Sequence, residues 1–328
     1  MDQVQGLNLS LEELKKLFQE TPSGGNGLFF NDMEGVRAIL TPADKKADFI
    51  IYEDKTLVFV KSQLGYPAIY ELRDSGFEAP AEAVLMDLDG TSIRSENFWV
   101  WIIECTTQRL LDNPSFNFED EDLSHVSGHS VSEHLEYCIQ KYCPDKTLEE
   151  ARRIYFEITH YEMKEIIEGR GKQDAFVPSP GLKDFLLTLK SKGVKIGLVT
   201  SGLYEKAWPE LISAFRTLDM GDPLEFYDSI ITAGHSLRKG QAGTLGELAP
   251  KPHPWLYAET ARIGLEMPAD KLSRVVGIED SSAGVLSIRL AGFTALGVSG
   301  GNIEQSGMKP LLSGFHDSLE DTLPFILG

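Results

Sequence analysis

Val84-Leu85-Met86-Asp87-Leu88-Asp89-Gly90-Thr91 is the stretch that decides how this chain folds and where its chemistry lies. The apolar residues from Ala83 to Met86 predict a buried strand, which ends in two aspartates at positions i and i+2 and a glycine turn. In an open α/β sheet, ligands bind at the carboxyl ends of the strands. Two carboxylates held together there repel each other unless a cation or a shared proton relieves the repulsion. The stretch therefore predicts a reaction centre in which one carboxylate is a Mg²⁺ ligand and nucleophile and the other moves protons.

Three further segments supply the other groups that such a centre requires. Lys195-Ile196-Gly197-Leu198-Val199-Thr200-Ser201-Gly202 predicts a second apolar strand, ending in a hydroxyl and a glycine turn that suit phosphate oxygens. Lys251-Pro252-His253-Pro254 places one lysine beside two prolines that fix the local backbone. A strand from Arg274 to Ile278 runs into Glu279-Asp280-Ser281-Ser282-Ala283-Gly284, which adds two carboxylates and a candidate N-cap serine. Together these segments predict a hard-cation site built from oxygens, a positive charge and a phosphate cradle.

In this order, the four segments resemble the four motifs of the haloacid dehalogenase superfamily, in its phosphatase and phosphomutase branch, over about residues 80 to 300. The resemblance implies that Asp87 attacks phosphorus and forms an aspartyl-phosphate. It implies that Asp89 protonates the leaving oxygen and then deprotonates the hydrolytic water. It implies a phosphoryl-binding site made of Thr200, Ser201 and Lys251. It also implies a Mg²⁺ site whose ligands are Asp87, the carbonyl of Asp89, Glu279 and Asp280.

The activity expected from this resemblance is hydrolysis of a small phosphomonoester, with Mg²⁺ as the cofactor. Phosphoryl transfer depends on charge neutralisation and in-line positioning. A carboxylate attacks an anionic phosphate poorly unless Mg²⁺ and Lys251 screen the charge. The dehalogenase branch needs no metal and lacks the second aspartate, so Asp89, Glu279 and Asp280 argue against carbon–halogen chemistry.

Other functions stay open at this point. The main alternative is a sugar phosphomutase similar to beta-phosphoglucomutase, although Val131 stands where those enzymes carry an arginine for the distal phosphate. A phosphonate hydrolase would need a Schiff-base lysine from the inserted segment, and a non-catalytic phosphate-binding module would not need Asp89. Arg94 and His129 are candidate substrate contacts, and each also has a simpler interpretation as a solvated side chain. The joint occurrence of four motifs at four strand ends favours the phosphatase.

The alternation of strands and helices predicts an α/β fold, with a Rossmann-like doubly wound parallel sheet as its core. Residues 81–94 and 179–328 are expected to form this catalytic core, and residues 95–178, rich in helical spacing, an inserted α-helical cap. Residues 1–80 lie outside the resemblance and predict a small α+β appendage of unknown role. The stretch 234–250 is rich in glycine and polar residues, and it predicts a long loop that is either a mobile lid or a variable surface loop.

Composition restricts the partners. The chain of 328 residues carries 31 Lys and Arg against 50 Asp and Glu, a net charge of −19 that opposes binding to nucleic acid or an anionic membrane. Its three cysteines cannot all pair, and their spacing is not that of a metal site. No signal-like stretch or membrane-length apolar run is present. These features predict a soluble, cytoplasmic protein that acts on a small phosphorylated metabolite, and they do not predict its oligomeric state.

Overall fold

The computed structural model describes residues 3–24, 27–61, 67–123, 131–172, 174–238, 241–244 and 248–328. The chain divides into two compact units. The core unit comprises Met1–Ser92, Ser179–Ala207 and Met220–Gly328, and the helical unit comprises Ile93–Pro178 and Trp208–Asp219.

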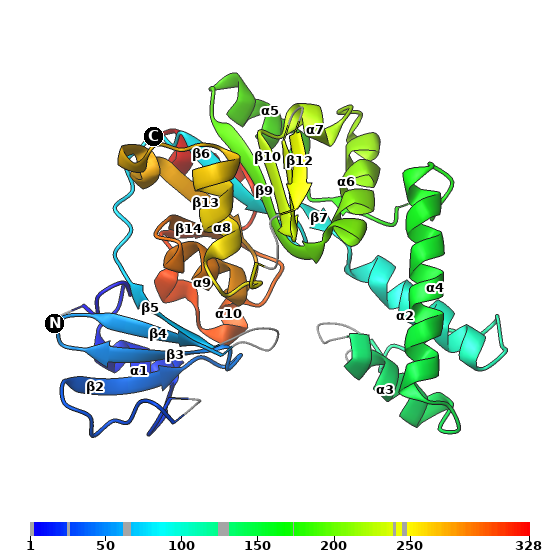
Figure 1. Ribbon diagram of the computed structural model, residues 1–328, viewed down its shortest axis with the longest axis horizontal. Helices are drawn as coiled ribbons and strands as arrows, with labels where there is room; N and C mark the ends of the chain where they lie inside the picture. Colours follow the sequence, from blue (N-terminus) through cyan, green and yellow to red (C-terminus); the bar gives the residue numbers. More distant parts are fainter. Residues whose placement is uncertain are drawn as a thin grey trace. The chain divides into compact units, whose positions relative to one another are not determined.

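An eight-stranded sheet forms the centre of the core unit (Figure 1). Its strand order is β12-β11-β10-β9-β6-β13-β14-β15, and the six strands from β10 to β15 in this order run parallel. The bounds are β6 (Ala83–Asp87), β9 (Lys195–Leu203), β10 (Ser229–Ala233), β13 (Val275–Glu279), β14 (Thr294–Val298) and β15 (Gly314–His316). The chain adds β9 and β10 on one side of β6 and then β13, β14 and β15 on the other, so the strand order reverses beside β6. The predicted α/β class with a doubly wound parallel sheet is confirmed.

The sequence of β6 explains its central place in this sheet. All five of its residues are buried, and Ala83, Val84, Leu85 and Met86 are each 0% exposed. A continuous apolar run without alternation is typical of a parallel strand that is covered on both faces. The first polar side chain, Asp87, comes where the strand ends, so the sheet delivers a carboxylate to its carboxyl edge.

Part of the stretch 234–250 forms strands rather than the continuous loop that its composition predicts. Within the described residues, β11 (His235–Arg238) and β12 (Gln241–Thr244) form an antiparallel hairpin that extends the sheet beyond β10. The segment has little apolar character to mark it as a strand, and of its residues Leu237 is buried. Backbone hydrogen bonds to the edge of β10 order it instead, and a lid role of this stretch stays a prediction.

Short helices connect the strands of the core unit. The helix α9 packs against β13 and β14, and α8 packs against α9 and β9. The helix α6 (Tyr204–Leu218) begins in this unit and ends in the helical unit. The other helical elements of the core unit are α5 (Leu182–Ser191), α7 (Pro223–Phe226), α8 (Trp255–Glu259), η1 (Thr260–Gly264), η2 (Ala269–Arg274), α9 (Ser282–Leu290), α10 (Ile303–Ser306), η3 (Lys309–Leu311), η4 (Glu320–Thr322) and α11 (Leu323–Leu327).

The N-terminal part of the core unit is a five-stranded antiparallel sheet with one helix. Its elements are α1 (Leu11–Leu17), β1 (Gln19–Glu20), β2 (Val36–Thr41), β3 (Ala47–Tyr52), β4 (Thr56–Val60) and β5 (Ala68–Leu72), and the sheet order follows the chain. Phe49 and Leu72 of this sheet belong to the same buried hydrophobic cluster as Leu286 of α9 and Phe293. The N-terminal sheet therefore shares its hydrophobic core with the parallel sheet.

The helical unit is built around three helices, α2 (Glu96–Leu110), α3 (Val131–Tyr142) and α4 (Leu148–Ile167). A short antiparallel ribbon of β7 (Ile93–Arg94) and β8 (Val177–Pro178) joins its two ends. Arg216, in the part of α6 that belongs to this unit, donates from its guanidinium to the carbonyls of Ile166 and Ile167, both at 2.9 Å, which satisfies the C-terminal carbonyls of α4. In the described parts of the chain, no helix is long and apolar enough to cross a membrane.

Candidate active site

The adjacent strands β9, β6 and β13 bring the polar ends of the predicted motifs together. Asp87 is the last residue of β6, Glu279 is the last residue of β13, and Asp280 follows it directly. Asp87 pairs in register with Val199 of β9, the residue before Thr200. Because the three strands are parallel, these side chains arise at the same edge of the sheet. That edge lies beside the point where the strand order reverses, where α/β sheets bind ligands.

Three carboxylates meet in the interior at this edge. Single oxygens of Asp87, Glu279 and Asp280 lie within 4.8 Å of one another. The three residues are 5%, 1% and 7% exposed, respectively, so bulk water screens their repulsion poorly. Among the described residues, this is the one group of three or more His, Cys, Asp and Glu side chains close enough to share a metal ion.

Lys251 is the countercharge within this cluster. Its Nζ contacts the Asp87 carboxylate and donates to Glu279 Oε1 at 2.6 Å. Its side chain is 8% exposed, and its ammonium lies 5.1 Å from the centre of the Tyr257 ring. Burial lowers the pKa of Lys251, but Asp87 and Glu279 outweigh that effect, so its pKa is raised and the ammonium stays charged. Lys251 is therefore held at the nucleophile candidate by two carboxylates.

One ammonium does not neutralise the three carboxylates. Burial, then the charge of Glu279, raises the pKa of Asp87 well above its usual range, although Lys251 opposes the shift. Burial and Glu279 likewise raise the pKa of Asp280 to about 7. With all three acids ionised, the cluster and Lys251 together carry two negative charges. A divalent cation that prefers hard oxygen ligands fits both this charge and this donor set.

Glu279 is held by several hydrogen bonds besides its contact with Lys251. Tyr257, in α8, donates its hydroxyl to Glu279 Oε1 at 2.7 Å, and Ser281 Oγ donates to Glu279 Oε2 at 3.0 Å. A Cβ atom at Gly284, in the first turn of α9, would lie 1.8 Å from Glu279 Oε1. Only glycine leaves room there for the carboxylate. Tyr257 is not part of any predicted motif; its place in the first turn of the helix after Lys251 is the signal that could have found it.

Asp89 has a different environment from Asp87. It accepts from Lys206 Nζ at 3.0 Å and from Thr200 Oγ1 at 3.5 Å, and its side chain is 33% exposed. The Thr200 hydroxyl in turn accepts from the amide of Gly202 at 2.9 Å. A partly exposed carboxylate can exchange protons with solvent, which a general acid and base must do. Lys206 is a further residue of the site that the sequence analysis does not identify, and it lies in the first turn of the helix after the Thr200 strand.

Other residues of the predicted motifs restrain the lysine loop and the Asp280 side chain. Ser201 Oγ accepts from the backbone amide of Lys251 at 3.1 Å, so the second motif restrains the lysine loop. Thr91 Oγ1 donates to Asp280 Oδ1 at 3.4 Å. A Cβ atom at Gly90, which has φ of +86°, would lie 2.1 Å from Asp280 Oδ2. The glycine of the first motif therefore allows both the turn and the approach of Asp280.

The two candidate substrate contacts are not part of this geometry. Arg94 belongs to β7 in the helical unit, and its side chain is exposed. His129 lies outside the described residues. Their roles stay predictions.

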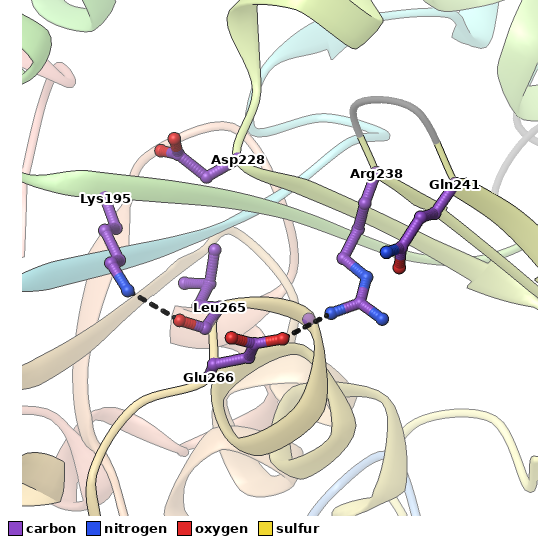
Figure 2. Close-up of a pocket in the computed structure, with 7 residues that line it drawn as sticks. Lys195, Asp228, Arg238, Gln241, Leu265 and Glu266 are labelled. Atoms are coloured by element: carbon purple, nitrogen blue, oxygen red, sulfur yellow. Dashed lines mark hydrogen bonds and ion pairs between the residues drawn. The ribbon is translucent and has the colours of Figure 1, made fainter.

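A cavity of about 280 Å³ lies at the opposite edge of the sheet (Figure 2). It is lined by Lys195, Asp228, Arg238, Gln241, Gly264, Leu265 and Glu266. Lys195 is the first residue of β9, whereas Thr200 follows the apolar run of β9 and Asp87 is the last residue of β6. The cavity therefore lies at the amino ends of these strands. The cations of the cavity are already engaged: Lys195 Nζ donates to the carbonyl of Leu265 at 2.7 Å, and Arg238 pairs with Glu266 at 3.2 Å. The carboxylate cluster is therefore the candidate active site.

Comparison with known proteins agrees with this geometry. The sequence model of the family described as haloacid dehalogenase-like hydrolase matches residues 84–233. No curated protein sequence matches the chain at a significant level.

Several solved structures share its fold. A haloacid dehalogenase hydrolase of family IA, variant 3, from Entamoeba histolytica has a TM-score of 0.53 and 16% identity, over 75% of this chain and 97% of that one. A predicted phosphoglycolate phosphatase from Haemophilus somnus has a TM-score of 0.51 and 20% identity, over 75% and 98%. CbbY from Rhodobacter sphaeroides, solved with phosphate, has a TM-score of 0.50 and 19% identity, over 74% and 96%. The family match over residues 84–233 supports the predicted resemblance to the haloacid dehalogenase superfamily of hydrolases, and the solved structures share the fold of the chain.

Proposed function

We propose that this protein is a Mg²⁺-dependent phosphatase that hydrolyses a small phosphomonoester through an aspartyl-phosphate on Asp87. The observation that carries the proposal is the convergence of Asp87, Glu279 and Asp280 with Lys251 in one buried cluster. With its three carboxylates ionised, this cluster and Lys251 carry two negative charges, which one divalent cation would neutralise. The Lys251 ammonium contacts the nucleophile candidate, Asp87. The predicted phosphoglycolate phosphatase among the structural neighbours supports the same class of activity.

The residues have separable roles in this proposal. An oxygen of Asp87 attacks phosphorus while the bond from phosphorus to the ester oxygen breaks, and Asp89 gives its proton to that leaving oxygen. Asp89 then takes a proton from the water that attacks the aspartyl-phosphate, which releases phosphate and restores Asp87. Lys251 and Thr200 hold the phosphoryl oxygens.

Asp87, the carbonyl of Asp89, Glu279 and Asp280 would hold Mg²⁺, directly or through water. When bound, the ion supplies neutralisation of the charge shared by the phosphoryl group and the attacking carboxylate. The net charge of −19 makes such local positive charge more necessary for an anionic substrate. It also favours a small phosphorylated metabolite over nucleic acid as the substrate.

The test is hydrolysis of p-nitrophenyl phosphate and acetyl phosphate by the purified protein, with MgCl₂ or with EDTA. The wild type should be active only with the metal, Asp87→Asn should be inactive, and Asp89→Asn should be strongly impaired. Asp270→Asn, an exposed aspartate in η2, is the matched control and should behave as the wild type. Full activity of Asp87→Asn would remove the nucleophile assignment. Formation of an isomeric sugar phosphate instead of free phosphate would favour the phosphomutase.

A further inference from the structure

The position of Lys251 depends on a loop with no regular secondary structure. The segment from Lys251 to Pro254 lies between the described residues of β12 and the start of α8. Within the parallel core, the loop is held by the Lys251 amide, which donates to Ser201 Oγ, and by the His253 carbonyl, which accepts from Ser287 Oγ at 2.6 Å. These two contacts fix backbone atoms on either side of Pro252. The side chain of His253 is fixed by a different part of the chain.

The His253 ring is held by the N-terminal sheet. The hydroxyl of Tyr70, in β5, and His253 Nδ1 are hydrogen-bonded at 2.9 Å. His253 is 2% exposed, and among the described residues its Nε2 has no hydrogen-bond partner. Burial lowers the pKa of His253, so the ring is neutral at neutral pH. A buried imidazole with one recorded ring hydrogen bond takes its orientation from that bond.

Tyr70 also contacts the start of the next helix. Its ring packs edge-on against His253 and against Trp255, with ring centres 5.9 and 6.2 Å away. Trp255 is the first residue of α8, the helix that carries Tyr257 to Glu279. One tyrosine therefore contacts the C-terminal part of the segment that presents Lys251 and the first residue of the helix that follows it.

The same N-terminal sheet reaches the other loop of the site. Asp44, between β2 and β3, accepts from Ser282 Oγ at 2.6 Å, and Ser282 lies two residues after Asp280. This contact is independent of Tyr70. The N-terminal part of the chain therefore contacts the loop that presents Lys251 and the segment that follows Asp280.

We propose that Tyr70 is a positioning residue for Lys251. Through this residue, the N-terminal sheet within residues 1–80 helps to position the groups of the active site. Tyr70 does not touch the carboxylate cluster; it acts through His253 and Trp255 on the loop that presents the ammonium. The inference rests on the proposed function, because it assigns Lys251 a role in phosphoryl transfer. A misplacement of about 1 Å is enough to lower turnover substantially.

The test compares Tyr70→Phe, which removes the hydroxyl and keeps the ring, with Tyr52→Phe. Tyr52 is in β3 of the same sheet and packs on the sheet's other hydrophobic cluster. We expect Tyr70→Phe to lower kcat/KM for p-nitrophenyl phosphate by about tenfold, with an unchanged MgCl₂ concentration for half-maximal activity. Tyr52→Phe should remain within twofold of the wild type.

A second measurement reads Lys251 without turnover. In protein labelled with ¹³Cε-lysine, the NMR signal that disappears in Lys251→Met belongs to Lys251. It should move in Tyr70→Phe and stay in place in Tyr52→Phe. A Lys251 signal of folded Tyr70→Phe that coincides with the wild-type signal overturns the proposal, as does wild-type kcat/KM in that variant. If the Lys251 signal moves in Tyr70→Phe but the wild type has no phosphatase activity, the proposed function is refuted and the positioning role of Tyr70 stands.

Discussion

Replacing Asp280 with asparagine is expected to stabilise the metal-free protein at pH 8 while removing its response to Mg²⁺. Burial and the neighbouring Glu279 raise the pKa of Asp280 from 3.8 to about 7. The folded protein therefore keeps a proton that the unfolded chain releases near pH 4. Stability falls as the pH rises from about 4 to about 7, and the full penalty is present above pH 7.

The magnitude follows from the shift in pKa. A difference of about 3 pK units corresponds to about 4 kcal/mol of unfolding free energy. Asparagine has nearly the same shape and no charge, so Asp280→Asn should gain up to about 4 kcal/mol at pH 8. At pH 5 only part of the stability penalty from Asp280 has developed, so Asp280→Asn should gain about 2 kcal/mol. The variant also loses one of the charges that raise the pKa of Asp87.

The assay is urea unfolding followed by tryptophan fluorescence, at pH 5 and pH 8, in EDTA and in MgCl₂. With Mg²⁺ at a hundred times its dissociation constant, the wild type should gain about 2.7 kcal/mol, and Asp280→Asn should gain much less. Asp270→Asn should match the wild type in every condition. The reasoning fails if Asp280→Asn is less stable than the wild type at pH 8 in EDTA. It also fails if Mg²⁺ stabilises the variant as much as the wild type.

Two other changes test single contacts of the site. Lys206→Met removes the ammonium that contacts Asp89, and it should lower kcat on p-nitrophenyl phosphate by about tenfold with little change in Mg²⁺ affinity; an unchanged kcat would show that this contact is not used. Gly284→Ala places a Cβ atom 1.8 Å from a Glu279 oxygen, and it should cost at least about 2 kcal/mol of unfolding free energy in urea. Gly76→Ala, whose Cβ would meet nothing within 4 Å, is the matched control, and equal stability of the two alanine variants would contradict the packing argument.

The fold could be predicted from the sequence because the positions of the strand ends depend on backbone topology alone. Buried apolar runs predict the parallel strands, and the polar residue after each run predicts which side chains lie at the carboxyl edge. Asp87, Glu279 and Asp280 converge because β6 and β13 are neighbours in the sheet.

Side-chain direction and long-range contacts could not be predicted in this way. Tyr257 and Lys206 approach the site only because α8 and α6 are packed at particular rotations, which the sequence pattern does not specify. The contact of Tyr70 with His253 joins residues 183 positions apart. The hairpin of β11 and β12 carries little apolar signal, because it is ordered by the free edge of β10 rather than by burial of alternate side chains.

The hydrophobic cluster shared by the two sheets has a consequence for biosynthesis. Leu14, Phe49 and Leu72 leave the ribosome early, but Leu286 and Phe293, which lie in the same cluster, are made near the end of translation. The first sheet must therefore wait, with an apolar face uncovered, until nearly the whole chain has been synthesised. An apolar face uncovered during that interval is prone to aggregation, and interruption of translation before Ser282 would leave the cluster without Leu286 and Phe293.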